Sequence, residues 1–158
     1  MADLDRSQLI YLIAMNSAKG LILQGVDLSE LDLRSLYLTG ANLKLSKLQK
    51  ANLSQVNLEK AVLEDADLQY ADLSEAILVG ANLSRANLIG SDLRAADLTD
   101  ADLREADLRS ANLRGAVLTR ANLWHANLND ANLVYANIEG AKGLPVEIYE
   151  QLQSKTEG

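Results

Sequence analysis

Leucine recurs at every fifth position along most of this chain. The series runs from Leu23 to Leu133 and ends at Ile138, which gives 24 consecutive centres without an insertion or deletion. Two positions before each centre the residue is Ala in 17 of 24 cases and otherwise apolar or small. The residue directly before the centre is Asp or Asn in 18 of 24 cases. Residues 21–140 therefore repeat the motif A-[DN]-L-x-x.

A period of five fits neither a regular helix nor a flat strand. On an α-helix, five residues advance by about 500°, so the leucines would spiral around the axis. On a strand, an odd period would send successive leucines to opposite faces. All centres can share one interior only if the chain turns at each repeat, and turns of about 90° close a coil after four repeats. Asp and Asn suit such corners because their side chains hydrogen-bond nearby backbone groups.

Corners alone also permit a three-sided coil, but the exceptions to the motif favour four sides. Apolar residues replace Asp or Asn at two sets of positions, Ile22 with Val62, and Tyr37 with Ile77 and Val117. Within each set the spacing is 40 residues, a multiple of 20 and not of 15. The sequence thus favours an all-β solenoid with 20 residues in each coil.

Both flanks of the repeat region predict short helices that cover the ends of the solenoid. An open solenoid end exposes apolar side chains and unpaired backbone groups. A helix from about Asp5 to Ala18 would place Leu9, Leu12 and Ile13 on one side, and Pro145 suits the first turn of a second helix. That second helix would align Leu144, Ile148 and Leu152. We therefore expect an N-terminal helical cap at 1–20, the repeat domain at 21–140, and a C-terminal helical cap and tail at 141–158.

The run ANLSRANLIGSDLRAADLTDADLREADLRSANLRGAVLTRANL resembles the pentapeptide-repeat family, and the resemblance covers residues 21–140. It implies a right-handed quadrilateral β-helix of about six coils, stacked into a rod of roughly 29 Å at the usual strand spacing. It also implies that the centre and the residue two before it fill the interior, while the other three positions face solvent.

The residues offer little for catalysis. The absence of cysteine excludes disulfides, thiolate metal sites and cysteine nucleophiles. The only histidine, His125, stands beside Trp124 at a position expected on the surface, and a lone histidine supports neither a metal site nor a triad. Asp72 is expected beneath Asp92, which could hold a hard cation, but such residues more often serve the backbone at a corner. We predict no enzyme, no metal and no cofactor.

Charge bears on the partners and the compartment. A net charge of −7 disfavours nucleic acid and anionic membrane as partners. The acidic start argues against a secretory signal, and no apolar run approaches the ~18 residues of a membrane span. We expect a cytoplasmic monomer.

The leading functional hypothesis is a non-catalytic structural or protein-interaction scaffold with an unknown protein partner, of the kind that the family supplies abundantly in cyanobacteria. A possible partner-binding strip comprises Tyr37, Val62, Ile77, Val79 and Val117. The alternative explanation of these residues is that β-branched side chains suit exposed strand positions.

A second functional hypothesis is DNA mimicry, because the quinolone-resistance members of the family resemble B-DNA and bind DNA gyrase. The charges argue against it, because acidic and basic residues are spread evenly over the four expected sides. Opposite charges also alternate along expected columns, such as Asp65, Arg85 and Glu105, or Asp100 and Arg120.

Overall fold

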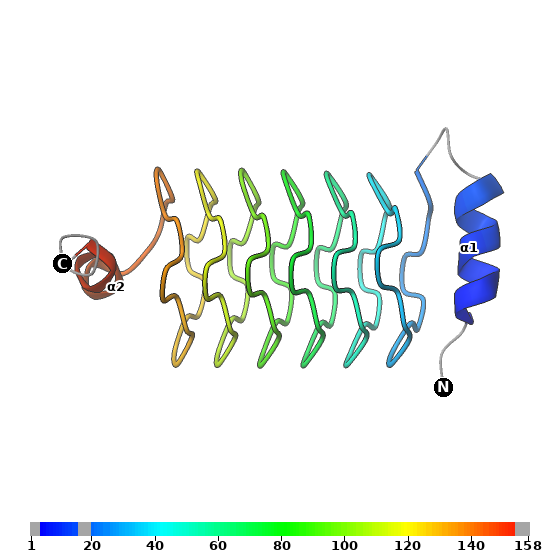
Figure 1. The fold of residues 1–158 in the computed structure, drawn as a ribbon, viewed down its shortest axis with the longest axis horizontal. Coiled ribbons are helices and arrows are strands. Elements are labelled where there is room, and N and C mark those ends of the chain that lie inside the picture. The colour runs from blue at the N-terminus through cyan, green and yellow to red at the C-terminus, as the bar shows by residue number, and fades with distance from the viewer. Residues whose placement is uncertain (1–3, 16–19, 154–158) are drawn as a thin grey trace.

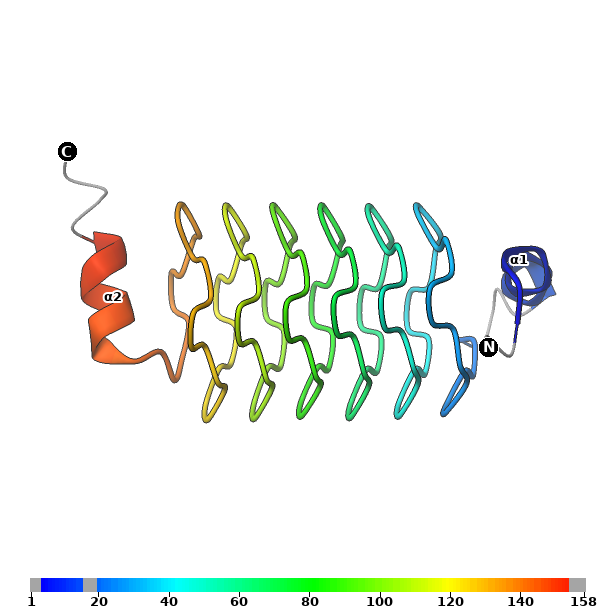
Figure 2. The same cartoon turned by 90° about the horizontal axis from the view of Figure 1, so that it is seen from below.

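The repeat region forms a straight rod of stacked coils with one helix at each end (Figures 1 and 2). The computed structural model describes residues 4–15 and 20–153, and the side chains among them up to Tyr149. Helix α1 spans Arg6–Met15 and helix α2 spans Val146–Gln153. The two predicted helical segments thus each contain a helix, while residues 1–3, 16–19 and 154–158 of the predicted caps lie outside the described residues.

Every repeat ends in a tight turn. The amide that follows the turn donates to the carbonyl of the centre in all 24 repeats, as Val26 N does to Leu23 O and Ala141 N to Ile138 O. The second turn residue has a positive φ at every fifth position from Gly20 to Gly140, which is the geometry of a type II turn. The glycines at these positions have positive φ, a conformation that glycine adopts readily. However, 18 non-glycine residues adopt the same conformation, and none of them is β-branched.

Neighbouring coils are held together by single parallel bridges between residues 20 apart. They run from Ile22 with Asn42 to Asn122 with Lys142. The described residues contain isolated bridges rather than continuous strands, because two of every five residues form the turn. Because the bridges join residues 20 apart, each coil has 20 residues and four turns. The coil is therefore four-sided, as the 40-residue spacing in the sequence favoured.

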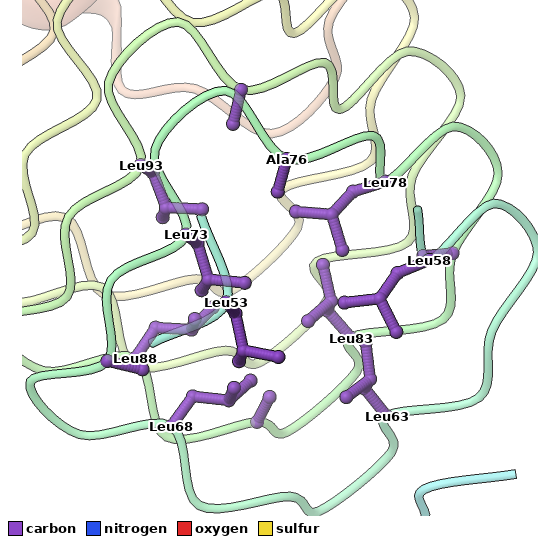
Figure 3. Close-up of a cluster of buried hydrophobic side chains, with 14 of the residues drawn as sticks. Leu53, Leu58, Leu63, Leu68, Leu73, Ala76, Leu78, Leu83, Leu88 and Leu93 are labelled. Carbon is purple, nitrogen blue, oxygen red and sulfur yellow. The ribbon is translucent and has the colours of Figure 1, made fainter. Parts of the chain in front are cut away.

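The interior is a stack of leucine and alanine (Figure 3). Leu53, Leu73 and Leu93 lie one above another on one side of the coil, and Leu63 and Leu83 do so on another. The centres from Leu28 to Leu123 are at most 2 % exposed. The assignment of the centre to the interior is therefore confirmed, and so is that of the residue two before it, from Ala41 to Ala121. Ser46 and Ser91 occupy two of these interior positions, and Ser91 Oγ donates to Leu88 O.

Helix α1 lies across the first coil (Figure 1). Asp5 and Gln8 form a capping box, since Gln8 N donates to Asp5 Oδ1 and Asp5 N donates to Gln8 Oε1, each at 2.8 Å. Leu9 is fully buried, and Leu12 and Ile13 pack against the core. The side of α1 predicted to face the coil is the side that does so.

Arg6 closes part of the first coil's free edge. In the rod, the carbonyls of the bridge residue and of the residue two positions later each accept from the amide 19 residues earlier, as Asn42 O does from Leu23 N and Lys44 O from Gly25 N. For Asp32 O and Arg34 O those amides would belong to a preceding coil, and the Arg6 guanidinium donates to both carbonyls instead. This role was not predicted, because a single Arg in a helix carries no sequence signature of it.

Helix α2 lies across the last coil (Figure 2), where Leu144 and Ile148 pack against the core. The contribution predicted for Leu152 lies outside the described side chains. Gly143, at φ 79°, permits the exit from the rod, because a Cβ at this position would collide with the backbone of Trp124. The leucine centres are slightly more accessible at this end, since Leu128 and Leu133 are 7 % and 6 % exposed whereas Leu23 is 2 % exposed.

Candidate partner-binding surface

The Asp or Asn before each centre supports the adjoining corner. Its side-chain Oδ1 accepts from the amide two residues later, as Asp27 does from Ser29 N and Asn82 from Ser84 N, each at 3.0 Å. All 18 Asp and Asn residues of this position make this Asx bond. The predicted role of these residues is thereby confirmed.

Six repeats give up this bond because another residue precedes the centre. Five of these residues are apolar or aromatic and one is basic: Ile22, Tyr37, Lys47, Val62, Ile77 and Val117. A hydrogen bond of this kind contributes roughly 0.5–1.5 kcal/mol. Apolar side chains at these sites are therefore not explained by the stability of the corner.

The predicted partner-binding strip divides between two adjacent sides of the rod. Tyr37, Ile77 and Val117 lie in one column, two coils apart, with Asn57 and Asp97 bridging them on the coils between. Val79 follows one residue after the centre on the same side. Val62 does not join them, because it bridges Asn42 and Asn82 on the next side. We call the side with centres Leu38, Leu58, Leu78, Leu98, Leu118 and Ile138 the Ile77 side.

Much of the Ile77 side is accessible to a partner. Tyr37 is 75 % exposed and Ile77 is 41 % exposed, while Val79 and Val117 are half-buried. A hollow of about 210 Å³ lies where this side meets α1, lined by Ile13, Tyr37 and Thr39 among others. Tyr37 therefore stands beside a recess at the N-terminal end of the column.

Most charged groups on the rod are paired with each other. In four repeats with the sequence D-L-R, the Arg forks onto the Asp two residues earlier: Asp32–Arg34, Asp92–Arg94, Asp102–Arg104 and Asp107–Arg109. The side-chain hydrogen bonds from Arg34 lower the pKa of Asp32 to about 2. The same cause lowers the pKa of the other three Asp carboxyls. These pairs were not predicted, although the repeated D-L-R triplet is a sequence signal for them.

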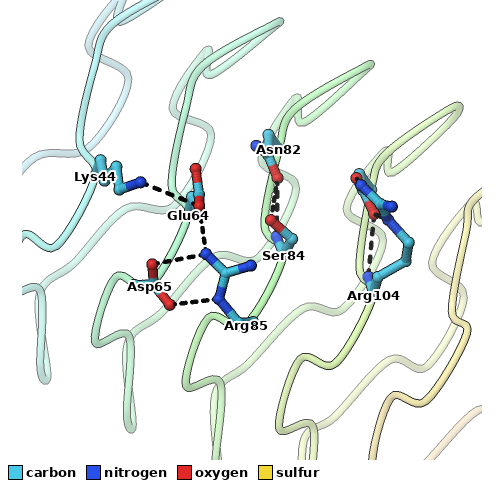
Figure 4. Close-up of polar contacts among 8 residues, drawn as sticks. Lys44, Glu64, Asp65, Asn82, Ser84, Arg85 and Arg104 are labelled. Carbon is cyan, nitrogen blue, oxygen red and sulfur yellow. Dashed lines mark hydrogen bonds and ion pairs between the residues drawn. The ribbon is translucent and has the colours of Figure 1, made fainter.

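Charges also pair between coils, as predicted (Figure 4). Arg85 donates to Asp65 at 2.8 Å and to Glu64, which also receives Lys44 at 3.0 Å. Arg120 donates to Asp100 at 2.6 Å. The predicted continuation from Arg85 to Glu105 has no ion pair among the described residues. Arg114 comes two residues after Asn112 rather than after an Asp, so it has no D-L-R partner. Its guanidinium lies instead over the Tyr135 ring, 4.8 Å from the ring centroid.

The residues considered for chemistry lie at the surface or support their own corners. His125 is exposed, and its ring lies 6.3 Å from that of Trp124. Asp72 bridges Asp92 as expected, but each accepts hydrogen bonds from its own turn, from Ser74 and Arg94. The described residues contain no group of three or more His, Cys, Asp or Glu able to hold a metal. Within the same residues, neither helix has the length and apolar character needed to cross a membrane.

Comparison with known proteins gives a consistent picture. The family model of pentapeptide repeats matches residues 46–85, 76–115 and 111–142, with eight copies. A pentapeptide repeat protein from the thylakoid lumen of Arabidopsis thaliana is 35 % identical, with 66 % of this chain and 69 % of that chain covered and a TM-score of 0.52. No curated protein matches the chain.

Two further solved structures are more distant. HetL of the cyanobacterium Nostoc, involved in heterocyst differentiation regulation, is 24 % identical over 89 % of this chain and 99 % of that chain, with a TM-score of 0.38. Full-length QnrB1, a plasmid-mediated fluoroquinolone resistance protein, is 14 % identical over 87 % and 97 %, with a TM-score of 0.40. Structures of pentapeptide repeats are right-handed quadrilateral β-helices, which is the architecture that the sequence resemblance implied.

Proposed function

Because this chain belongs to the pentapeptide-repeat family, we propose that it is a non-catalytic scaffold that binds a protein partner on the Ile77 side of its rod. One observation carries the proposal. Tyr37, Ile77 and Val117 occupy a position where 18 other repeats have Asp or Asn, and each forgoes a hydrogen bond that would strengthen its corner. Departures from a local rule without a gain in stability are typical of functional surfaces.

Packing does not account for these side chains. Leucine centres are equally buried in repeats that carry Asn at this position, since Leu58 and Leu83 are fully buried as Leu78 is. An exposed β-branched residue can favour a strand, but here each coil contributes only one bridge residue to a side, which leaves little strand to favour. Contact with another molecule remains the physical benefit that an exposed Tyr and Ile offer.

Affinity capture from a native extract tests the proposal, with Ile77→Lys and Val62→Lys as matched baits. Both variants place a charge on a side chain that lacks an Asx bond, but on different sides of the rod. We expect a specific protein that wild type and Val62→Lys retain and Ile77→Lys loses. Equal retention by both variants, or no specific protein on the wild type, would contradict the proposal.

A further inference from the structure

The Ile77 side alternates in character from one coil to the next. Three coils present an apolar residue before the centre, Tyr37, Ile77 and Val117. The coils between and beyond them present Asn57 with Glu59, then Asp97, then Asn137 with Glu139. Along the rod, each apolar contact is thus followed by an acidic one.

The acidic groups of this side are largely available to a partner. Asp97 and Glu139 form no salt bridge within the described part of the chain, unlike the D-L-R carboxylates of other sides. The Glu59 carboxylate forms an ion pair with Lys60 of its own corner at 3.0 Å, and the Lys60 side chain is 75 % exposed. A partner that complements this side carries positive charge between its apolar contacts.

Unpaired backbone donors accompany the apolar residues. Because Tyr37, Ile77 and Val117 cannot act as Asx acceptors, the amides two residues later lack the bond that other repeats have. Among the described residues, the backbone amides of Thr39, Val79 and Thr119 donate to no acceptor. Each apolar side chain therefore stands near a free N–H group that can donate to a partner's carbonyl.

The spacing of these contacts selects one kind of chain. Two coils at the usual spacing of about 4.8 Å separate successive apolar residues by about 9.6 Å. A polyproline II segment repeats every three residues, or about 9.3 Å, and keeps all of its carbonyls free to accept hydrogen bonds. Side chains on one face of a strand repeat at about 6.7 Å, and a helical heptad repeats at about 10.5 Å. Over two intervals the polyproline II repeat stays within about 1 Å of the column.

We infer that the Ile77 side binds an extended, polyproline II-like segment of a partner, with an apolar residue at every third position and Lys or Arg between. The inference rests on the proposed function and names the chemistry of the partner. The recess beside Tyr37 gives the first apolar residue, such as a proline, an aromatic wall, and aromatic surfaces are what proline-rich segments contact in other modules. The acidic side chains on the alternate coils would form ion pairs with the Lys or Arg residues between the apolar residues of the segment.

A labelled peptide of four Pro-Pro-Arg triplets, titrated with the full-length protein and followed by fluorescence anisotropy, tests the inference. Two probes control for composition and charge: a scrambled peptide with the same residues but no three-residue period, and four Pro-Pro-Glu triplets. We expect saturable binding of the Pro-Pro-Arg peptide, and binding at least about tenfold weaker for both controls. Equal binding of the scrambled peptide, or no binding of Pro-Pro-Arg, would overturn the inference.

Substitutions locate the site without weakening the fold. Ile77→Asn with Val117→Asn removes two apolar contacts but supplies Asx acceptors to the amides of Val79 and Thr119, so this variant should be at least as stable as wild type. Val62→Asn makes the same change on the next side. We expect the double variant to bind the peptide at least about tenfold more weakly and Val62→Asn to bind it as wild type does. Equal loss in both variants would overturn the location.

A charge variant separates the two kinds of contact. Asp97→Asn keeps the acceptor for Thr99 N and removes only the charge. We expect it to weaken peptide binding and to reduce its salt dependence, and an unchanged salt dependence would contradict the role of the acidic coils. If affinity capture at Ile77 succeeds but the peptide does not bind, the inference fails while the proposed function stands. If both fail, both are wrong.

Discussion

At the residue scale, each five-residue repeat has side chains that face the core and side chains that face the solvent. The centre and the residue two before it fill the interior, and the side chain of the Asp or Asn between them accepts a hydrogen bond from the amide two residues later. Asn82 illustrates the arrangement, because its Oδ1 accepts from both Ser84 N and Ser84 Oγ, while Leu83 beside it is fully buried. Neighbouring residues in the sequence therefore have very different effects on stability.

Leu83→Asn should lower the free energy of unfolding by roughly 2–5 kcal/mol, because it removes buried apolar surface and leaves an amide without partners in the core. Asn82→Ala should cost about 1 kcal/mol, because it removes only the corner bond and leaves the freed amide close to water. Thermal and chemical unfolding of the two variants measure the difference. Equal losses would contradict the inside and outside assignment of the repeat.

The paired carboxyls predict a loss of stability in acid. Hydrogen bonds from Arg34 lower the pKa of Asp32 to about 2, and Arg partners likewise lower the pKa of Asp92 and Asp107. A carboxyl whose folded pKa lies below its unfolded value of about 3.9 stabilises the fold above that value and loses this contribution as pH falls through the folded pKa. We expect the melting temperature to hold between pH 7 and about 5 and to fall between about pH 4 and 2.

The control for the acid effect is Asp92→Asn, which keeps an acceptor for Arg94 N but loses the ion pair. This variant should melt at a temperature closer to that of wild type at pH 2 than at pH 7. A difference that does not depend on pH would show that the pair contributes no proton linkage at this site.

At the element scale, the coil was predictable and its ends were only partly so. The coil follows from one period repeated 24 times, so each repeat supports the same conclusion and errors cannot accumulate. Helix α1 was predicted from Leu9, Leu12 and Ile13, but Arg6 was not, because its partners are backbone carbonyls that no sequence pattern marks. The register of the bridges was predictable, because the 40-residue spacings already grouped Val62 with Ile22, and Ile77 with Tyr37 and Val117.

We propose that α1 and α2 act as caps that keep the protein monomeric. Leu144 and Ile148 pack against the last coil, and their removal would uncover Leu128 and Leu133, which are already slightly exposed. Deletion of residues 144–158 should therefore produce dimers or aggregates at micromolar concentration, whereas the intact chain should scatter light as a monomer of 17.1 kDa. An intact chain of twice that mass would contradict the proposal.

At the scale of the whole molecule, the surface is acidic in total but largely neutralised in detail. Much of the negative charge lies within ion pairs, such as the four D-L-R pairs and the pairs of Asp65 and Asp100 with Arg on the next coil. Duplex DNA, in contrast, presents unpaired charges in regular rows. The apolar column on the Ile77 side has no counterpart in a polyanion.

We therefore expect the purified protein not to inhibit the supercoiling activity of DNA gyrase at micromolar concentration. A supercoiling assay at low and moderate salt measures this, with a double-stranded DNA competitor as the positive control. Potent inhibition that weakens with salt would favour DNA mimicry over a scaffold function, because screening weakens contacts between charged surfaces.

The hydrogen bonds between coils also give the rod a net dipole moment along its axis. Between two adjacent coils, each side has two amides that point toward the C-terminal end, as Leu23 N and Gly25 N do toward Asn42 O and Lys44 O, and one that points back, as Asn42 N does toward Leu21 O. This excess of amides that point toward the C-terminal end recurs in successive repeats. The peptide dipoles therefore add along the axis, with the positive pole at the C-terminal end. An α-helix has the opposite polarity. The cationic Arg6 on the carbonyls of the first coil, and acidic Glu139 and Glu147 near the last, match the two poles of this field.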